Sequence, residues 1–486
     1  MIQKYVFDWD PKKSMGIVTS DHLDTLREAL SIEDKQASIM RYRTGRKWMP
    51  TRKYMITPNG RFQIGLFQLI LQHLKKTNIP FEAIITEKFK ENFKPSLVKG
   101  NDYNIMPLNL EARFYQDQCV QNCLIQGNGV IQVATAGGKT LIMALLIRNV
   151  NYIKPQKTLL ITIPSLVEQS YNDFISYGLN KHVSISKWDG SNEYSNADVV
   201  IASNTILMSK KQDLSVLKNF DILVVDECHK IRRGNEINKI LKKIKTNHRF
   251  GFTGTLPESI DDIWNIIGQL GPIIYEKTST ELKDMGYIAP AQAIILKLDY
   301  RNKDIYSSTP SIDNPTGMYN EECDFIYKNQ FRNETICKLC SNVSKNTLIL
   351  VDRLEYQQQL IDMLKKALPN KNIQYVRGDV EKDDREKIKL IMEKNDNVIC
   401  IAMSSIFSTG INIKNIHFII FTMPGKAKIR LLQSIGRGLR LNENKDKLII
   451  FDLADNLFYG LKHLQQRLQL YDEEKISYVE KEIREP

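Results

Sequence analysis

The 486-residue sequence contains no run of ~18 uninterrupted apolar residues, the length that a helix needs to cross a bilayer. Its first residues mix charged and apolar side chains and lack the apolar core of a secretory signal. Neither a low-complexity tract nor a short-period repeat is present. A membrane protein, a secreted protein and a repeat array are therefore not expected, and we expect a cytoplasmic globular protein.

Cysteine is scarce and poorly placed for cross-linking or metal binding. The seven cysteines are odd in number and spread along the chain. Cys337 and Cys340 form a single CxxC, and Cys119 and Cys123 stand four apart, but neither pair has a second Cys or His pair at zinc-like spacing. We therefore expect reduced thiols and no metal site built on cysteine.

Positive charge is in excess, and the excess is unevenly distributed. The chain has 68 Lys and Arg residues against 56 Asp and Glu, a formal net charge of +12. Residues 1–102 hold 18 of the former and 11 of the latter, so seven of the twelve excess charges lie in this N-terminal part. Such an excess favours a polyanionic partner such as nucleic acid. Residues 1–104 are expected to form a small basic α+β domain.

After this segment, short apolar runs alternate with helical stretches, which is typical of parallel sheets covered by helices on both faces. A first set of runs occupies residues 130–133, 158–163, 199–201 and 222–225, and a second set occupies 347–351, 398–401, 418–421 and 448–451. Two tandem α/β domains are therefore predicted, over 105–277 and 278–486. The polar stretch 301–322 is expected to be an exposed insertion.

A glycine-rich turn follows the first of these runs. Its residues are Ala134, Thr135, Ala136, Gly137, Gly138, Lys139 and Thr140. In such a turn, backbone N–H groups surround phosphate oxygens at a helix N-terminus, lysine reaches the β- and γ-phosphates of ATP, and the Thr hydroxyl binds Mg²⁺. Because Val133 stands where the strict GxxxxGK[ST] pattern has its first glycine, a plain strand-to-helix turn is the alternative.

A second candidate element of the nucleotide site is the tetrad Asp226-Glu227-Cys228-His229, which directly follows the apolar run 222–225. Ligands of open α/β sheets bind at the carboxyl ends of the strands. There Asp226 can hold Mg²⁺ and Glu227 can polarise the water that attacks the γ-phosphate, with His229 beside them in the catalytic group. A helix cap with an acidic first turn would explain the pair alone, but its combination with the glycine-rich turn favours an ATPase.

The order of these segments resembles that of superfamily 2 helicases. Further matching segments in the first α/β domain are Arg113-Phe114-Tyr115-Gln116, Ile163-Pro164-Ser165-Leu166, Ala202-Ser203-Asn204-Thr205 and Thr253-Gly254-Thr255. The resemblance implies two RecA-like domains that use ATP with Mg²⁺. It also implies that Gln116 reads the adenine edge, that an aromatic residue, taken as Tyr115, packs on the base, and that Thr253-Gly254-Thr255 couples hydrolysis to movement.

The second α/β domain continues the resemblance. Its matching segments are Leu350-Val351-Asp352-Arg353, Ser408-Thr409-Gly410-Ile411-Asn412 and Gln433-Ser434-Ile435-Gly436-Arg437-Gly438-Leu439-Arg440. Arg437 and Arg440 are three apart on a predicted helix, so both could neutralise charge on the γ-phosphate. A solvated basic helix face is the alternative. The resemblance adds Gln433 to the catalytic group and Gly410 to the nucleotide-binding group, and it implies that ATP closes a cleft between the domains.

Several hydroxyl and amide side chains could grip a phosphate backbone without reading sequence. By analogy with the family they are Ser165, Asn204, Thr205, Ser408 and Thr409, although each could serve as a helix cap instead.

A basic and aromatic stretch in the N-terminal domain could bind phosphates and stack on bases. Its residues include Arg41, Arg43, Arg46, Lys47 and Trp48 and are followed by Arg52-Lys53-Tyr54. A solvated turn with a core-packed Trp48 explains that stretch as well.

A basic N-terminal domain before a compact helicase core resembles phage recombination helicases of the UvsW type. The segment from Phe407 to Ile413 and the stretch from Arg41 to Trp48 carry this resemblance. It implies a DNA helicase acting on branched DNA, such as forks and Holliday junctions, in recombination or repair, within the cytoplasm of a host cell and in company with recombination proteins. Three alternatives stay open: a DExH RNA helicase, a duplex translocase subunit of a restriction or remodelling complex, and a nucleotide-gated clamp.

Overall fold

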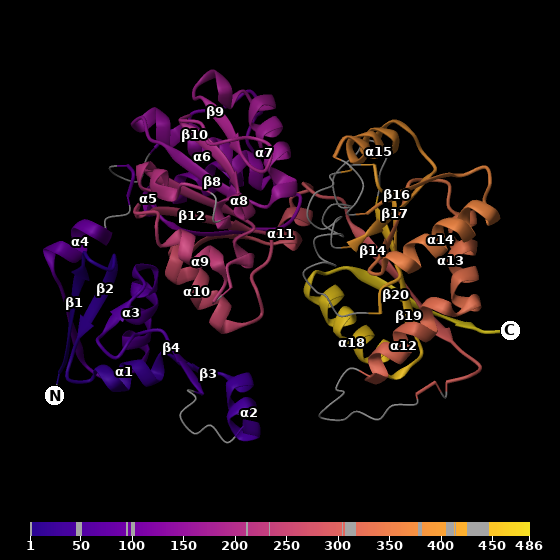
Figure 1. The fold of residues 1–486 in the computed structure, drawn as a ribbon, viewed down its shortest axis with the longest axis horizontal. Helices are drawn as coiled ribbons and strands as arrows, with labels where there is room; N and C mark the ends of the chain where they lie inside the picture. The colour runs from indigo at the N-terminus through magenta and orange to yellow at the C-terminus, as the bar shows by residue number, and fades with distance from the viewer. Residues whose placement is uncertain are drawn as a thin grey trace. The chain divides into compact units, whose positions relative to one another are not determined.

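A computed structural model describes residues 2–44, 51–93, 96–98, 103–209, 212–232, 234–303, 305–306, 317–377, 382–404, 413, 415–424 and 447–486. The chain divides into two compact units (Figure 1). Unit 1 comprises Met1–Val133 and Gly138–Lys277, and unit 2 comprises Thr278–Pro486 with the short segment Ala134–Gly137. In the described ranges, no helix combines the length and apolar character that crossing a membrane requires.

Unit 1 begins with a small mixed sheet of order β5-β2-β1-β6. β1 pairs antiparallel with β2 and parallel with β6, and β3 and β4 form a separate antiparallel pair. The elements in chain order are β1 (Gln3–Asp10), β2 (Met15–Thr19), α1 (Leu23–Ala29), β3 (Ser31–Glu33), α2 (Lys35–Thr44), β4 (Arg52–Tyr54), β5 (Arg61–Phe62), α3 (Phe67–Lys76), β6 (Phe81–Ile85) and α4 (Glu87–Phe93). The expected α+β character of this region is confirmed.

An aromatic core holds this N-terminal region together. The rings of Phe7, Phe67 and Phe89 lie with centroids 4.7 to 6.2 Å apart in tilted and edge-on arrangements, which are the geometries that aromatic pairs prefer. Trp264 and Ile267, from a helix far along the chain, pack against the same core. The N-terminal region is therefore attached to the rest of unit 1 through an apolar contact.

The larger sheet of unit 1 has seven strands in the order β13-β7-β12-β11-β8-β10-β9, and every pair is parallel. All five residues of β8 and of β10 are buried, as expected for strands covered on both faces. The elements are α5 (Phe114–Gln126), β7 (Gly129–Val133), α6 (Lys139–Ile153), β8 (Thr158–Thr162), α7 (Pro164–Ser176), β9 (Ile185–Trp188), β10 (Val199–Ser203), α8 (Asn204–Met208), β11 (Ile222–Asp226), α9 (Glu236–Leu241), β12 (His248–Thr253), α10 (Ile260–Leu270) and β13 (Ile273–Lys277).

Unit 2 holds a second seven-stranded parallel sheet, of order β16-β17-β15-β18-β19-β14-β20. Its elements are α11 (Ser279–Asp284), β14 (Ala291–Asp299), α12 (Gly317–Lys328), α13 (Gln330–Asn342), β15 (Thr347–Val351), α14 (Leu354–Ala367), β16 (Asn372–Val376), α15 (Lys382–Lys394), β17 (Val398–Met403), β18 (Phe418–Phe421), β19 (Leu448–Asp455), α18 (Phe458–Glu473) and β20 (Ser477–Arg484). The predicted fold class, two tandem RecA-like parallel-sheet domains preceded by a small α+β domain, is confirmed.

One expectation about unit 2 is wrong in part. The stretch 301–322 was expected to be an exposed insertion or loop, and residues 301–303 are exposed, but α12 begins at Gly317 and Glu322 is 1% exposed. Glu322 accepts hydrogen bonds from the backbone N–H groups of Tyr459 (2.9 Å) and Gly460 (2.6 Å), in the first turn of α18. A carboxylate is stabilised at a helix N-terminus, where backbone N–H groups lack partners, so this part of the stretch is structural.

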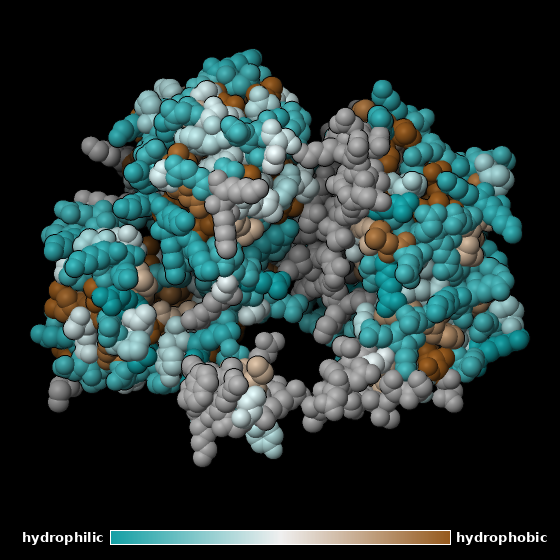
Figure 2. Space-filling view, viewed as in Figure 1, coloured by the Kyte–Doolittle hydropathy of each residue, from teal (hydrophilic) through white to brown (hydrophobic). Residues whose placement is uncertain are grey.

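Hydrophilic residues dominate the face seen in the space-filling view, and a hydrophobic cluster lies over β1 at its left (Figure 2).

All seven cysteines are free thiols, and all but Cys337 are buried. Within the part of the chain that the structure describes, no three His, Cys, Asp or Glu side chains form a group suited to a metal ion.

Candidate active site

The glycine-rich turn joins β7 to α6, as the sequence predicted. β7 ends at Val133 and α6 begins at Lys139. Ala136 (φ 68°) and Gly138 (φ 76°) both adopt the left-handed backbone conformation, and the Gly137 N–H donates to the Ala134 carbonyl at 3.0 Å. Left-handed residues alternating with ordinary ones turn successive N–H groups into a concave nest for an anion. The turn therefore has the backbone form of a phosphate-binding loop.

Gln116 lies against this turn. A Cβ atom added at Gly138 would lie 2.4 Å from Gln116 Nε2, so glycine is required there by contact as well as by conformation. Gln116 is buried, and its Oε1 accepts a hydrogen bond from the Arg113 N–H at 2.9 Å. The structure thus brings together two segments that the sequence predicted to bind the nucleotide.

The aromatic partner of the base needs correction. Tyr115 is 1% exposed and its backbone carbonyl accepts from the Tyr275 hydroxyl at 2.9 Å, so its ring presents no free face to an adenine. The neighbouring Phe114 is 71% exposed. Because successive residues of a helix point in different directions, an expectation based on the segment alone could not separate the two rings.

Lys139 and Thr140 are half-buried at the start of α6. The Lys139 ammonium donates to the Val133 carbonyl at 3.2 Å. Its charge also acts to lower the pKa values of both Asp226 and Glu227, although burial outweighs it at Asp226. The lysine therefore lies within electrostatic reach of the acidic pair across the sheet edge.

Asp226 is the last residue of β11, and Glu227 follows it with φ 50°. The Thr162 hydroxyl donates to Asp226 Oδ2 at 3.3 Å, and the Glu227 N–H donates to Asp226 Oδ1 at 2.9 Å. Burial, followed by the charge of Glu227, raises the pKa of Asp226 to about 6. Burial also acts to raise the pKa of Glu227, but the contact with His229 and the charge of Lys139 outweigh it and lower that pKa to about 2.

His229 joins this acidic pair to the next strand. Its Nδ1 lies 2.9 Å from the Thr253 hydroxyl and 3.2 Å from Glu227 Oε2. The Thr253 hydroxyl donates its single hydrogen to the Thr255 carbonyl at 2.8 Å. It can therefore only accept from His229, which assigns the proton to Nδ1. A chain of hydrogen bonds thus runs from the imidazole to the Thr253-Gly254-Thr255 segment.

The residues present fit ATP with Mg²⁺. Glu227 Oε2 is buried without a hydrogen-bond partner among the described residues, and Asp226 is a buried carboxylate whose ionised form burial and Glu227 disfavour. A divalent cation near such a pair would favour the ionised form of both. Magnesium in nucleotide sites is commonly held by one or two carboxylates together with phosphate oxygens, and Thr140, the second residue of α6, carries a further oxygen.

Three of the candidate phosphate grips lie at the same sheet edge. Ser165 is in the first turn of α7, after β8, and Asn204 and Thr205 begin α8, after β10. β8 and β10 are neighbouring strands. Ser203 caps α8 by accepting from the Ile206 N–H at 3.2 Å, so Asn204 and Thr205 are not needed for that cap.

Other candidates fall where the structure gives no description. Ser408, Thr409, Gly410, Gln433, Arg437 and Arg440 lie outside the described residues, as do Arg46, Lys47 and Trp48, and nothing is described of the Arg43 side chain. Arg41 is described and exposed, and the adjacent Tyr42 is 91% exposed. Their expected roles stay predictions.

The continuation of the basic stretch proves to be structural. Lys53 Nζ lies 3.0 Å from Asp261 Oδ2 and 3.2 Å from Asp34 Oδ2, and the Tyr54 hydroxyl donates to Glu28 Oε1 at 2.6 Å. Asp261 is distant in the sequence, whereas Asp34 and Glu28 lie in the same N-terminal region. The local sequence suggested that the charge of Lys53 is free to bind DNA, whereas the fold pairs it with Asp34 and Asp261.

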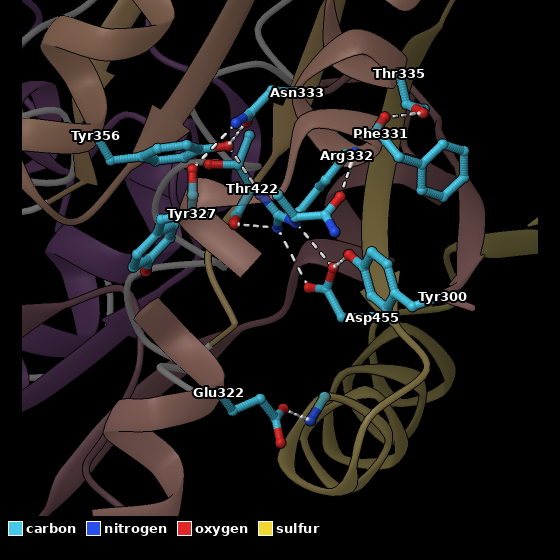
Figure 3. Close-up of polar contacts among 12 residues, drawn as sticks. Tyr300, Glu322, Tyr327, Phe331, Arg332, Asn333, Thr335, Tyr356, Thr422 and Asp455 are labelled. Atoms are coloured by element: carbon cyan, nitrogen blue, oxygen red, sulfur yellow. Dashed lines mark hydrogen bonds and ion pairs between the residues drawn. The ribbon is translucent and has the colours of Figure 1, made fainter. Parts of the chain in front are cut away.

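Sequence reasoning also missed a buried polar network in unit 2 (Figure 3). Arg332 on α13 is fully buried and donates to Asp455 Oδ1 at 2.8 Å and Oδ2 at 3.3 Å, to the Tyr356 hydroxyl at 2.9 Å and to the Thr422 carbonyl at 2.7 Å. Asp455 ends β19 and Thr422 follows β18. One arginine thus ties together the carboxyl ends of two neighbouring strands, at the edge where α/β sheets carry their sites.

Comparison with known proteins agrees with this architecture. The family described as "Type III restriction enzyme, res subunit" matches residues 109–258, and the family "Helicase conserved C-terminal domain" matches residues 332–442. The chain is 28% identical over 402 residues to the ATP-dependent DNA helicase uvsW of Enterobacteria phage T4, which covers 77% of this chain and 78% of that protein.

Two solved structures illustrate the shared fold. A fragment assigned to the HsdR subunit of a type I restriction enzyme from Vibrio vulnificus YJ016 has a TM-score of 0.58 at 17% identity, covering 82% of this chain and 73% of that one. Dbp5 of S. cerevisiae, solved with RNA and ADP BeF3, has a TM-score of 0.52 at 13% identity, covering 77% and 90%. With both helicase families matched in order and two parallel sheets to carry them, the chain belongs to the ATP-dependent helicases of superfamily 2.

Proposed function

We propose that the protein is a DNA helicase or translocase that acts on branched DNA, migrating, regressing or unwinding junctions during recombination, repair or replication. The observation that carries the proposal is its similarity to a phage DNA helicase over more than three quarters of both chains. The basic charge of residues 1–102 supports a nucleic-acid partner. We also propose that it works in the cytoplasm of a host cell together with recombination proteins.

ATP with Mg²⁺ supplies the phosphoryl group whose transfer to water drives such a motor. In this chain the N–H groups of Thr135, Ala136 and Gly138 would hold phosphate oxygens, while Gly137, whose N–H donates to the Ala134 carbonyl, would keep the turn in shape. Lys139 would reach the β- and γ-phosphates. Thr140 and Asp226 would hold the metal. Glu227, whose Oε2 accepts no hydrogen bond from the described residues, would orient the attacking water.

Phe114 would cover the adenine that Gln116 recognises, since its ring is the exposed one. Gly410, Gln433, Arg437 and Arg440 are proposed to complete the site from the second RecA-like domain. Ser165, Asn204, Thr205, Ser408 and Thr409 would hold the phosphates of the tracked strand. The exposed Arg41, with Arg43, Arg46, Lys47 and Trp48, would bind DNA at the branch.

A substrate panel tests the proposal. ATP turnover and strand separation are measured with a Holliday junction, a replication fork, linear duplex, single-stranded DNA and an RNA duplex. We expect the branched substrates to give the highest turnover and to be unwound. A preference for RNA, or turnover that no nucleic acid changes, would contradict the proposal, and so would full activity of Lys139→Ala.

Duplex translocation without strand separation is the second candidate. It is favoured by a 22% identity over 387 residues to the type I restriction enzyme EcoAI endonuclease subunit of Escherichia coli, which covers 71% of this chain. Displacement of a third strand from a DNA triplex, together with failure to separate a fork, would favour this candidate over the first.

A further inference from the structure

A cavity of about 220 Å³ opens beside the acidic pair and away from the glycine-rich turn. It is lined by the ends of β8 and β11, by Asn204 and Met208 of α8, and by Lys230, Ile231 and Asn235–Ile237. No residue of the turn 134–140 contributes to it. The cavity is therefore distinct from the phosphate cradle, although Asp226 and Glu227, which are proposed to serve the ATP site, line it.

Apolar and polar residues line this cavity in similar numbers, and apolar atoms supply most of its surface. The apolar lining side chains are Ile161, Ile163, Met208, Val225, Ile231 and Ile237. Apolar walls with a few convergent polar groups are the usual form of a small-molecule site, and this size suits one flat ring system better than a whole nucleotide.

Three polar groups of the lining have unused hydrogen-bonding capacity among the described residues. Glu227 Oε2 and Asn204 Oδ1 are buried acceptors without a hydrogen bond, although His229 Nδ1 lies 3.2 Å from Glu227 Oε2. Lys230 is half-buried, and its ammonium forms neither a hydrogen bond nor an ion pair there. Unsatisfied buried polar groups are costly and call for a partner. The cavity thus offers two acceptors and one cationic donor.

We propose that this cavity binds a guanine-type base, a flat heterocycle with adjacent N–H donors and a ring carbonyl on one edge. The donors of that edge would satisfy Glu227 and Asn204, and its carbonyl would accept from Lys230. The apolar side chains would cover the ring faces, as in pockets that hold an extruded base. Adenine lacks the carbonyl and has the opposite donor pattern on that edge, so it leaves Lys230 without a partner.

Occupation of the cavity would slow ATP hydrolysis, because the base engages the carboxylate proposed to orient water. This consequence rests on the proposed function, whereas binding itself does not. The same chemistry has two sources: a free guanine nucleoside, or a guanine extruded from a strand held at Ser165 and Asn204.

Calorimetric titration of the full chain with guanosine, inosine and adenosine tests binding in the absence of ATP and DNA. We expect guanosine to bind, inosine to bind more weakly because it lacks one N–H donor group, and adenosine to bind at least roughly tenfold more weakly than guanosine. Lys230→Met should weaken guanosine binding by roughly tenfold. Equal affinities for guanosine and adenosine, or no binding of either, would overturn the proposal.

A matched pair of tryptophan variants locates the site. Met208 is 39% exposed and lines the cavity, whereas Met285 is 48% exposed and lies in the other unit. Met208→Trp should fill the cavity and abolish guanosine binding, and Met285→Trp should leave it unchanged. Both variants are first checked for an unaltered melting temperature, and Lys230→Met provides the same test if Met208→Trp unfolds. Retention of binding in Met208→Trp would overturn the assignment of the site.

The source is distinguished by ATP turnover on an all-thymine oligonucleotide and on the same oligonucleotide with central guanines. If ATP turnover is slower on the guanine-containing oligonucleotide and Lys230→Met restores it, the ligand of the cavity is an extruded base. Equal turnover on both, with inhibition by added guanosine, assigns a free nucleoside. If no nucleic acid stimulates turnover while guanosine still binds, the proposed motor function fails and the binding site stands.

Discussion

His229 Nδ1 lies 2.9 Å from the Thr253 hydroxyl, and this contact connects the segment after β11 with the last residue of β12. The same ring lies 3.2 Å from the carboxylate of Glu227. ATP hydrolysis at the proposed site would change the charge around Glu227 and so shift the His229 ring. The Thr253 hydroxyl would pass that shift to the Thr255 carbonyl, to which it donates. The contact is therefore a physical route from the nucleotide to the part of the chain expected to couple hydrolysis to movement.

Thr253→Val should separate ATP turnover from strand separation. Valine keeps the shape of the buried side chain but can neither accept from His229 nor donate to Thr255. Each hydrogen bond lost is worth about 1 kcal/mol, so we expect ATP turnover to change by only severalfold while base pairs separated per ATP fall much further. Parallel ATPase and unwinding assays measure both. Thr253→Ser retains the hydroxyl and should restore coupling; equal loss of both activities in Thr253→Val would contradict the route.

Gly138→Ala should abolish nucleotide binding. The new Cβ would lie 2.4 Å from Gln116 Nε2, and the backbone at φ 76° disfavours any side chain. Either the turn or Gln116 must move, and both are proposed to contact the nucleotide. Gly286→Ala is the matched control, since Gly286 has φ 71° and nothing within 4 Å of the added Cβ. Titration with a fluorescent ATP analogue should show normal affinity in Gly286→Ala; normal affinity in Gly138→Ala would exclude the proposed cradle.

Much of this site followed from the sequence because it depends on local pattern. An apolar run bounded by a glycine turn or a carboxylate pair predicts where a buried parallel strand ends, and Lys139 and Asp226 lie where such ends were expected. Strands with charged or partly exposed residues escaped prediction: β20 exposes most of its residues, and β14 alternates buried and half-buried ones. Neither forms the continuous apolar run that marked the central strands.

Long-range contacts could not be predicted from one sequence. Lys53 meets Asp261 across 208 residues, and Glu322 meets the start of α18 across 138. A charged residue has the same local signature whether the fold gives it a partner or leaves it in water. The side of α5 that faces outward, which decides between Phe114 and Tyr115, is likewise set by packing against the sheet.

Gly65→Ala should loosen the N-terminal region from α10. A Cβ at Gly65 would lie 1.9 Å from the Ile267 carbonyl oxygen and 2.9 Å from the Gly271 nitrogen, both backbone atoms that cannot rotate away. The apolar contact with Trp264 and Ile267 would then open. Limited proteolysis should release the N-terminal region faster, with a lower melting temperature. Gly190→Ala, where the added Cβ meets nothing within 4 Å, should have the proteolysis rate and melting temperature of the wild type. The same result for Gly65→Ala would contradict the prediction.

Arg332→Met should be among the most destabilising single substitutions in unit 2. It leaves the carboxylate of Asp455, 1% exposed, without its cationic partner, and loss of one member of a buried pair costs about 3–5 kcal/mol. Arg353→Met is the matched control, because the Arg353–Asp324 pair has side chains 40% and 56% exposed and such pairs contribute at most about 1 kcal/mol. Urea unfolding measures both. If the unpaired charge is the cause, the double variant Arg332→Met, Asp455→Leu should recover part of the loss; a further decrease would assign the cost to lost packing instead.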